Sequence, residues 1–124
     1  MIYFIGAGPG AADLITVKGK ELLEKADLII YAGSLVNPEL LNYAKPECII
    51  MDSAKMTLEE VIAAMVPAAQ AGKLVVRLHT GDPSVYGAHR EQIDLLRSYN
   101  LDFEIVPGVS SFCAAAACLD AEYT

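Results

Sequence analysis

Five short, continuously apolar runs recur along the chain, and this recurrence is the feature that most restricts how it can fold. The runs lie at residues 1–6, 28–31, 48–51, 74–78 and 103–106. None shows the polar–apolar alternation of a strand with one face in water, so both faces of the sheet are expected to be covered. The segments between the runs have helical spacing. The sequence therefore predicts an α/β fold with a mostly parallel five-stranded sheet and helices on both faces.

Helices are expected at residues 14–26, 38–43, 57–70, 83–98 and 110–119. Thr57 and Glu60 form a capping-box pattern at the start of the third helix. Pro67 lies inside that helix and predicts a kink or an early stop there. Asp82 is expected to cap the fourth helix, with Pro83 at its first position.

The chain has 124 residues, which fits one domain. Its last helix runs almost to Thr124, so we expect an N-terminal domain whose C-terminal partner lies outside this chain. The net charge of −7 argues against binding to nucleic acid or to an anionic membrane. Three cysteines without CxxC spacing indicate reduced thiols, and no basic segment precedes the first apolar run, so a cytoplasmic protein is expected.

The segments that follow the apolar runs are the candidate ligand-binding loops. In a parallel sheet, ligands bind beyond the carboxyl ends of the strands, and four of these five segments contain glycine. Gly6, Gly8 and Ala11 fit a loose dinucleotide-binding fingerprint. However, Pro9 removes a backbone donor, and the second run ends in Tyr31 rather than in an acid. A purely structural alternative is that the glycines only permit tight turns.

Taken together, the loops resemble those of the tetrapyrrole methylases. The shared motifs are GAGPG (residues 6–10), DLIT (13–16), TGDPSVYG (80–87) and VPGVSS (106–111). Three longer segments resemble the branch that methylates precorrin-4: YAGSLVNPELL (31–41), GDPSVYGAHREQ (81–92) and PGVSSFCAAAA (107–117). Each motif is weak alone, but their order and spacing match the family along essentially the whole chain.

The resemblance implies a two-domain enzyme that binds S-adenosylmethionine (AdoMet) between its domains and transfers a methyl group to carbon 11 of precorrin-4 or cobalt-precorrin-4. It also implies a homodimer. The AdoMet-binding residues that it implies in this domain are Pro9, Thr80, Gly81, Asp82, Val85, Ser110 and Ser111. The residues predicted to contact the tetrapyrrole are Tyr31, Ser34, His79 and Tyr86.

One position departs from the family pattern. Many members carry an aspartate directly after GPG, where this chain has Ala11. This leaves no catalytic acid assigned in the loop, and no general base is identified. Ser110 has no recognisable partner base, so an N-cap or a hydrogen bond to the ligand is favoured over a nucleophilic role.

The chemistry of the implied reaction fits the residue types. Methyl transfer from a sulfonium to an electron-rich carbon requires positioning and exclusion of water rather than a covalent nucleophile. A carboxylate held against the sulfonium would stabilise the ground state, so Asp82 is expected to bind another part of AdoMet or to shape its loop. The substrate carboxylates need cations, for which the candidates are Lys55, His79, His89 and Arg90. No cluster of ligands predicts a bound metal.

Three alternatives remain open from the sequence. The chain could belong to another tetrapyrrole methylase, acting on precorrin-2 or precorrin-3. It could be a nucleotide-binding Rossmann module. It could also be a folded scaffold that is catalytically silent by itself. The sequence does not distinguish the aerobic pathway from the one in which cobalt is inserted early.

Overall fold

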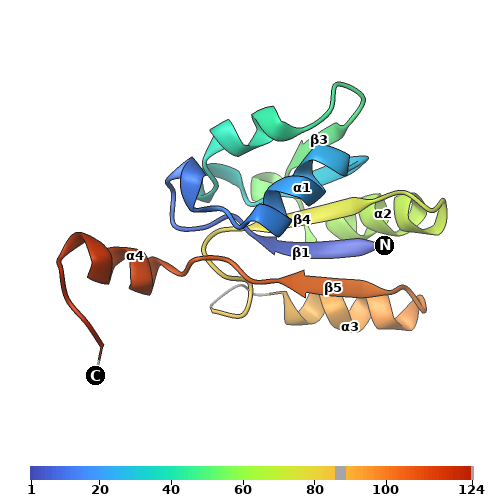
Figure 1. Cartoon of the computed structure of the whole chain (residues 1–124). Coiled ribbons are helices and arrows are strands. Elements are labelled where there is room, and N and C mark those ends of the chain that lie inside the picture. Colours follow the sequence, from blue (N-terminus) through green and yellow to red (C-terminus); the bar gives the residue numbers. More distant parts are fainter. Residues whose placement is uncertain (86–88, 124) are drawn as a thin grey trace.

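A computed structural model describes residues 1–85 and 89–123, apart from the side chain of Ser34. Five parallel strands form one sheet in the order β3-β2-β4-β1-β5 (Figure 1). The strands are β1 (Ile2–Gly6), β2 (Leu28–Tyr31), β3 (Ile49–Asp52), β4 (Val75–His79) and β5 (Phe103–Val106). This confirms the expected parallel α/β sheet and the positions of its strands.

Helices cover both faces of the sheet, as the apolar runs predicted. The α-helices are α1 (Val17–Lys25), α2 (Leu58–Gln70), α3 (Arg90–Ser98) and α4 (Ser111–Cys118). Short 3₁₀ helices span Ala12–Leu14, Gly33–Leu35, Pro38–Tyr43 and Ser53–Lys55. No helix among the described residues is long and apolar enough to cross a membrane.

Two apolar clusters hold the layers together, one on each face. Ile2, Phe4 and Ile30 point toward α2 and α3 and pack with Met65 and Leu96. Their neighbours along the strands point the other way, where Ile5, Ile29, Val76 and Leu78 pack with Leu23 of α1 and Leu40 of the Pro38–Tyr43 helix. This alternation follows from the two-residue period of a strand. Because both faces of the sheet are covered, residues pointing in either direction are buried, and the central strands are therefore almost entirely apolar.

The third predicted helix ends where expected, and the start of the fourth needs a correction. The α2 helix continues through Pro67 to Gln70, so of the kink or early stop expected at Pro67, the early stop does not occur. Burial of Val66 and Ala69 on either side of Pro67 explains why the helix persists despite the lost backbone donor. The fourth predicted helix begins at Arg90 rather than at Pro83. Residues 83–85 form a turn instead.

The α4 helix lies away from the body of the domain. Figure 1 shows it extending beyond the carboxyl end of β5, and Ala116 is its only buried residue. No charged residue occurs from Ile105 to Leu119, and Phe112 and Leu119 are 50% and 76% exposed. A helix that is apolar on all sides is normally covered by other protein.

Candidate functional site

Three glycine-containing loops meet where β4, β1 and β5 end. Because β1 lies between β4 and β5 in the sheet, the loops after these strands become neighbours. The Ala7 amide donates to the His79 carbonyl at 2.6 Å. Gly8 and Gly81 exchange two backbone hydrogen bonds, of 3.2 and 2.8 Å, in an isolated antiparallel bridge. The first and fourth loops are therefore joined through their backbones.

The fifth loop packs against the other two without any side chain between them. A Cβ atom on Gly108 would lie 2.2 Å from the Gly81 carbonyl oxygen and 2.7 Å from the Gly6 Cα. A Cβ on Gly6 would lie 2.6 Å from the Gly108 Cα. Such distances are too short for any side chain, so backbone contact is the reason for glycine at these two positions. In addition, Gly81 has a φ of +60°, which L-residues rarely adopt.

Asp82 bonds to two loops at once. One carboxylate oxygen accepts the Ser84 amide at 2.8 Å, and the other accepts the Gly108 amide at 3.1 Å. The Val85 amide donates to the Asp82 carbonyl, which closes a turn. The sequence predicted that Asp82 caps the following helix. This prediction is wrong, because that helix begins only at Arg90. The side chain of Asp82 joins the fourth loop to the fifth.

Ser110 is the N-cap of α4. Its hydroxyl accepts the Phe112 amide at 3.3 Å, and its carbonyl accepts the amides of Cys113 and Ala114. This confirms the N-cap interpretation. Ser111 follows as the first residue of the helix and is exposed.

The residues that the resemblance assigned to AdoMet lie on this edge. Thr80, Val85 and Ser111 are exposed, Pro9, Asp82 and Ser110 are half-buried, and Gly81 is buried. The structure thus brings together the three loops that carry them. Tyr86 lies outside the described residues.

A second hollow borders the ends of β2 and β3. It has a volume of about 440 Å³ and is lined by Tyr31, Gly33, Val36, Pro38 and Asp52. The Ser53 hydroxyl donates to the Tyr31 carbonyl at 3.0 Å. The Asn37 side-chain amide donates to the Gly10 carbonyl at 2.7 Å, which links this region to the first loop. The backbone of Ser34 lies in the adjoining 3₁₀ helix Gly33–Leu35.

Of the four candidate cations, His79 lies deepest. It is only 5% exposed, and its ring stacks on Phe4 at 6.0 Å between centroids. Burial, with the charges of Arg77 and His89, lowers the pKa of His79 to about 3. Its Nε2 has no hydrogen-bond partner in the part of the chain that the structure describes. A neutral, buried imidazole of this kind offers no positive charge to a substrate carboxylate.

The other three candidates are more accessible. Lys55 is exposed at the end of the 3₁₀ helix after β3. His89 is half-buried and precedes α3. The Arg90 side chain is 85% exposed and lies 3.9 Å from Asp94. No group of three His, Cys, Asp or Glu side chains within residues 1–85 and 89–123 could hold a metal ion.

Sequence reasoning missed a buried polar pair beneath this edge. Arg77 is 7% exposed; its Nε donates to Gln92 Oε1 at 3.2 Å, and its guanidinium also donates to the Ile30 carbonyl at 3.2 Å. Desolvation lowers the pKa of Arg77 to about 10, so the side chain remains charged at neutral pH. The available signal was an arginine in the middle of an otherwise apolar strand.

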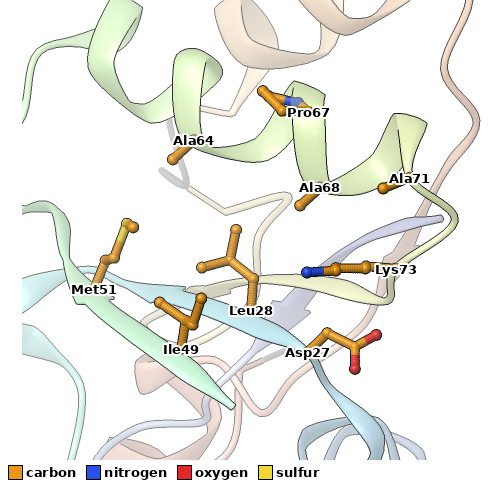
Figure 2. A pocket seen from close by; sticks show the side chains of 9 residues that line it. All are labelled: Asp27, Leu28, Ile49, Met51, Ala64, Pro67, Ala68, Ala71 and Lys73. Atoms are coloured by element: carbon orange, nitrogen blue, oxygen red, sulfur yellow. The ribbon is translucent and has the colours of Figure 1, made fainter. Parts of the chain in front are cut away.

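A further hollow lies at the opposite end of the strands, away from the glycine loops. Figure 2 shows it between α2 and the starts of β2 and β3, where Pro67 and Ala68 lie on one side and Leu28 and Ile49 on the other. The side chain of Lys73, which follows α2, extends toward Leu28. Its volume is about 280 Å³.

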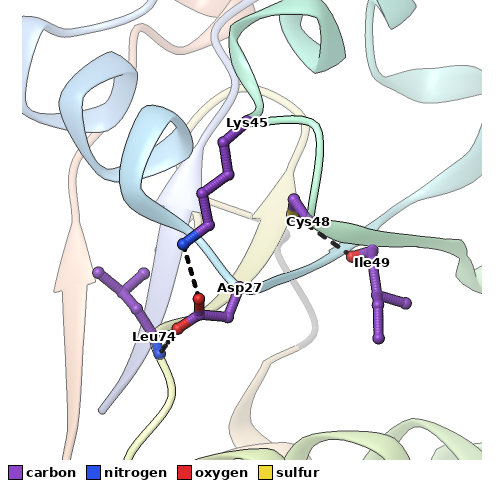
Figure 3. A network of polar contacts seen from close by, with 5 residues as sticks. All are labelled: Asp27, Lys45, Cys48, Ile49 and Leu74. Carbon is purple, nitrogen blue, oxygen red and sulfur yellow. Dashed lines mark hydrogen bonds and ion pairs between the residues drawn. The ribbon is translucent and has the colours of Figure 1, made fainter.

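The polar side chains beside this hollow bond to other groups of the same chain. Asp27 accepts from Lys45 Nζ at 2.7 Å and from the Leu74 amide at 2.8 Å (Figure 3). These bonds hold the pKa of Asp27 below its usual range. Desolvation raises the pKa of the neighbouring Cys48 thiol. We therefore regard this end as structural.

Comparison with known proteins points to the same family that the loop motifs resemble. A family model described as tetrapyrrole (corrin/porphyrin) methylases matches residues 1–124. The cobalt-precorrin-4 C(11)-methyltransferase of Methanocaldococcus jannaschii is 59% identical over 123 residues, which cover 99% of this chain and 48% of that protein.

Two solved structures extend the comparison. The cobalt precorrin-4 methyltransferase CbiF superposes with a TM-score of 0.96 at 52% identity, over 99% of this chain and 52% of that one. A uroporphyrin-III C-methyltransferase from Thermus thermophilus, complexed with S-adenosyl homocysteine, superposes with a TM-score of 0.77 at 34% identity, over 93% of this chain and 47% of that one.

The chain spans about half the length of the curated relatives it matches. Within that half, the match runs from the first strand to the last helix, and it includes all three glycine loops that the structure brings together. The chain belongs to the family of tetrapyrrole (corrin/porphyrin) methylases.

Proposed function

We propose that this chain forms one wall of an AdoMet-binding cleft in an enzyme that methylates carbon 11 of precorrin-4 or cobalt-precorrin-4. A second domain, corresponding to the remaining length of the relatives, would form the other wall. The observation that carries the proposal is the joining of the first, fourth and fifth loops into one edge. Pro9, Thr80, Gly81, Asp82, Val85, Ser110 and Ser111 lie on these loops.

The hydrogen bonds of the first loop favour AdoMet over a dinucleotide. A pyrophosphate is held by free backbone N–H groups of a glycine-rich loop. Here the amides of Ala7 and Gly8 already donate to carbonyls of the fourth segment, and Pro9 has no N–H. Three successive positions thus offer nothing to a phosphate, whereas AdoMet carries no phosphate to bind.

The proposed roles of the residues are positioning and exclusion of water. AdoMet, when bound, supplies an activated methyl group on a positively charged sulfonium. The joined loops would hold its adenosyl part in a fixed place, so that the substrate carbon is aligned with the methyl group. We place the macrocycle over the hollow that Tyr31 lines and beside which the backbone of Ser34 lies. Tyr86 stays a predicted contact outside the described residues. His79 does not line this hollow, and we propose that it acts only as a neutral, buried support.

Two further proposals concern the compartment and the oligomeric state of the enzyme. Cys48, Cys113 and Cys118 are all free thiols, which suits a reducing compartment, and we propose a cytoplasmic enzyme. The homodimer that the resemblance implies can be checked by light scattering on the two-domain protein, meaning this chain together with its second domain.

Calorimetry on the two-domain protein tests the proposal. AdoMet should bind and NADH should not. Incubation with AdoMet and precorrin-4 should then give a product that carries one additional methyl group by mass spectrometry. NMR spectroscopy should locate this methyl group on carbon 11. Turnover of precorrin-2 or precorrin-3 instead would assign the chain to another branch of the family. Binding of NADH alone would reject the methyltransferase assignment.

A further inference from the structure

We infer that Asp82 is a positioning residue, which sets the place of the fifth loop and the start of α4 rather than serving as a direct ligand of AdoMet. This inference rests on the proposed function. It concerns the one acid on the AdoMet-binding edge of the described residues that bonds to two loops. The separation of Asp82 and Gly108 is 26 positions in the sequence.

The geometry of the carboxylate explains why an aspartate is needed. Its two oxygens face two different donors, the amides of Ser84 and Gly108. An asparagine has one acceptor oxygen, and a serine hydroxyl is shorter. Only a short carboxylate can satisfy both amides from this position. Bonds from backbone N–H to an ionised oxygen are also stronger than neutral ones.

Asp52 provides an internal comparison. It is the last residue of the parallel strand β3 and lies at the same edge of the sheet, and its Oδ1 accepts the amide two residues later, Ala54, at 2.8 Å. The corresponding bond of Asp82 to Ser84 has the same length. Among the hydrogen bonds of the described residues, Asp52 has no second bond to another loop. The bond to Gly108 is therefore an addition to the ordinary turn found at both sites.

The position of Gly108 makes this bond important for α4. Pro107 has no N–H, so the Gly108 amide is the first donor after β5. Ser110, the N-cap of α4, follows two residues later. Since Ala116 is the only buried residue of α4, few contacts within this domain orient the helix. Within this domain, the direction in which α4 leaves the sheet (Figure 1) is then set mainly where the helix begins, by Asp82 and by the contacts of Gly108 with Gly6 and Gly81.

Hydrogen exchange on the AdoMet-free two-domain protein tests the structural half of the inference. Asp82→Ala should speed exchange of the Gly108 amide roughly tenfold or more, and exchange of the Ser84 amide should also rise. Asp82→Asn should release one of the two amides. The matched control Asp52→Asn removes a charge from the equivalent turn and should leave Gly108 unchanged. If the Gly108 amide exchanges as slowly in Asp82→Ala as in the wild type, the hydrogen bond from Gly108 to Asp82 does not hold the fifth loop and the inference is overturned.

A series of truncated ligands tests the functional half. The affinities of wild type and Asp82→Ala are compared for AdoMet, S-adenosylhomocysteine, 5′-methylthioadenosine and a 2′,3′-dideoxyribose analogue. Relative to AdoMet, S-adenosylhomocysteine lacks the sulfonium charge, 5′-methylthioadenosine lacks both that charge and the amino acid, and the last analogue lacks the ribose hydroxyls. A positioning role predicts the same fold-loss, about tenfold, for every ligand. A direct contact with one of these groups predicts that the loss disappears for every ligand that lacks the contacted group, and this result would overturn the inference.

The two proposals fail in different ways. If the wild-type protein binds no adenosyl ligand, the proposed function fails, and the AdoMet part of the inference fails with it. If the wild type binds AdoMet and the loss in Asp82→Ala depends on the ligand, only the positioning role is wrong. Thermal unfolding measured in parallel identifies a general loss of folding, which would lower the affinity of every ligand without a selective change at Gly108. That pattern would also count against the inference.

Discussion

Gly108 shows how a single residue can be required by its neighbours rather than by its own conformation. A Cβ added there would meet the Gly81 carbonyl oxygen at 2.2 Å. The Gly6 Cα would lie at 2.7 Å. Both of these are backbone atoms, which cannot rotate away as a side chain can. Among the glycines on the candidate edge, Gly6 is under the same constraint. Sequence motifs mark both positions, but they do not reveal that the two glycines touch each other.

We expect Gly108→Ala to lower the free energy of unfolding by about 3 kcal/mol, because the added methyl group overpacks a rigid backbone contact. Gly72→Ala is the matched control. Gly72 has a φ of +79° with nothing within 4 Å of the added Cβ, so its cost should be only ~1 kcal/mol, from backbone strain. Urea denaturation of both variants compares the two costs. Equal losses would show that the loops do not pack as closely as described.

His79 predicts a specific dependence of stability on pH. Its folded-state pKa of about 3 lies below the ordinary value of 6.5, so the native state favours the neutral ring. The stability that depends on this neutrality is complete above pH 6.5 and is lost as the pH falls toward 3. The slope is at most about 1.4 kcal/mol per pH unit.

His79→Phe removes the titrating group and retains an aromatic ring against Phe4. We expect the variant to unfold with the same or a higher free energy at pH 7 and to lose less stability than the wild type between pH 6.5 and 4. Denaturation curves across this range give the comparison. Parallel pH profiles for the two proteins would mean that His79 is not held neutral.

At the scale of elements, the sequence identified five strands and most of the helices, but it misplaced the start of α3. The GDP segment of residues 81–83 has the composition of a helix start, and Asp82 was expected to cap one. Instead, its second oxygen reaches the fifth loop, and α3 begins at Arg90. The sequence pattern is that of a helix N-cap, but the Asp82 carboxylate instead bonds to Gly108, which lies 26 residues away in the sequence.

The pair of Arg77 on β4 and Gln92 on α3 couples these two elements. Within residues 1–85 and 89–123, no carboxylate lies at ion-pair distance from Arg77. Gln92→Leu should therefore leave the buried Nε without an acceptor and cost about 2 kcal/mol. Arg77→Met removes the charge along with the need for an acceptor, and its cost should be within about 1 kcal/mol of zero.

The double variant Arg77→Met/Gln92→Leu completes a thermodynamic cycle. It should recover most of the stability lost in Gln92→Leu alone, since no donor is then left unpaired. Chemical denaturation of the four proteins provides the coupling energy. Additive losses in the double variant would show that the two side chains do not depend on each other.

At the scale of the whole molecule, the domain is a covered parallel sheet with one open, polar edge and one helix that extends past it. The open edge carries the joined glycine loops, and α4 begins there (Figure 1). The uncharged surface of α4 suits contact with the second domain that we propose. A ligand at this edge would then be enclosed only when that domain is present.

We therefore expect this chain alone to bind AdoMet more than about 100-fold more weakly than the two-domain protein does, because about half of the ligand's contacts would be missing. Calorimetry on both proteins measures the difference. Circular dichroism of the chain alone is the necessary control, since it shows whether the isolated domain is folded. Equal affinities in a folded chain would refute the interdomain site.

The sequence by itself determined the class of the fold, the positions of the strands and the membership of the family. These depend on local properties: continuous apolar runs, glycine at loop positions and the order of motifs along the chain. Tyr31, Thr80, Ser110 and the other loop residues could be placed at one sheet edge for the same reason, since the carboxyl ends of parallel strands share an edge.

Only the tertiary structure decided which loops touch. The order β3-β2-β4-β1-β5 brings the first, fourth and fifth loops together and leaves the other two beside Tyr31. It also buried His79, paired Arg77 with Gln92, and gave Asp82 its second partner. The physical reason is that strand order and side-chain partners arise from contacts between segments far apart in the chain. No periodicity within a single segment records those contacts.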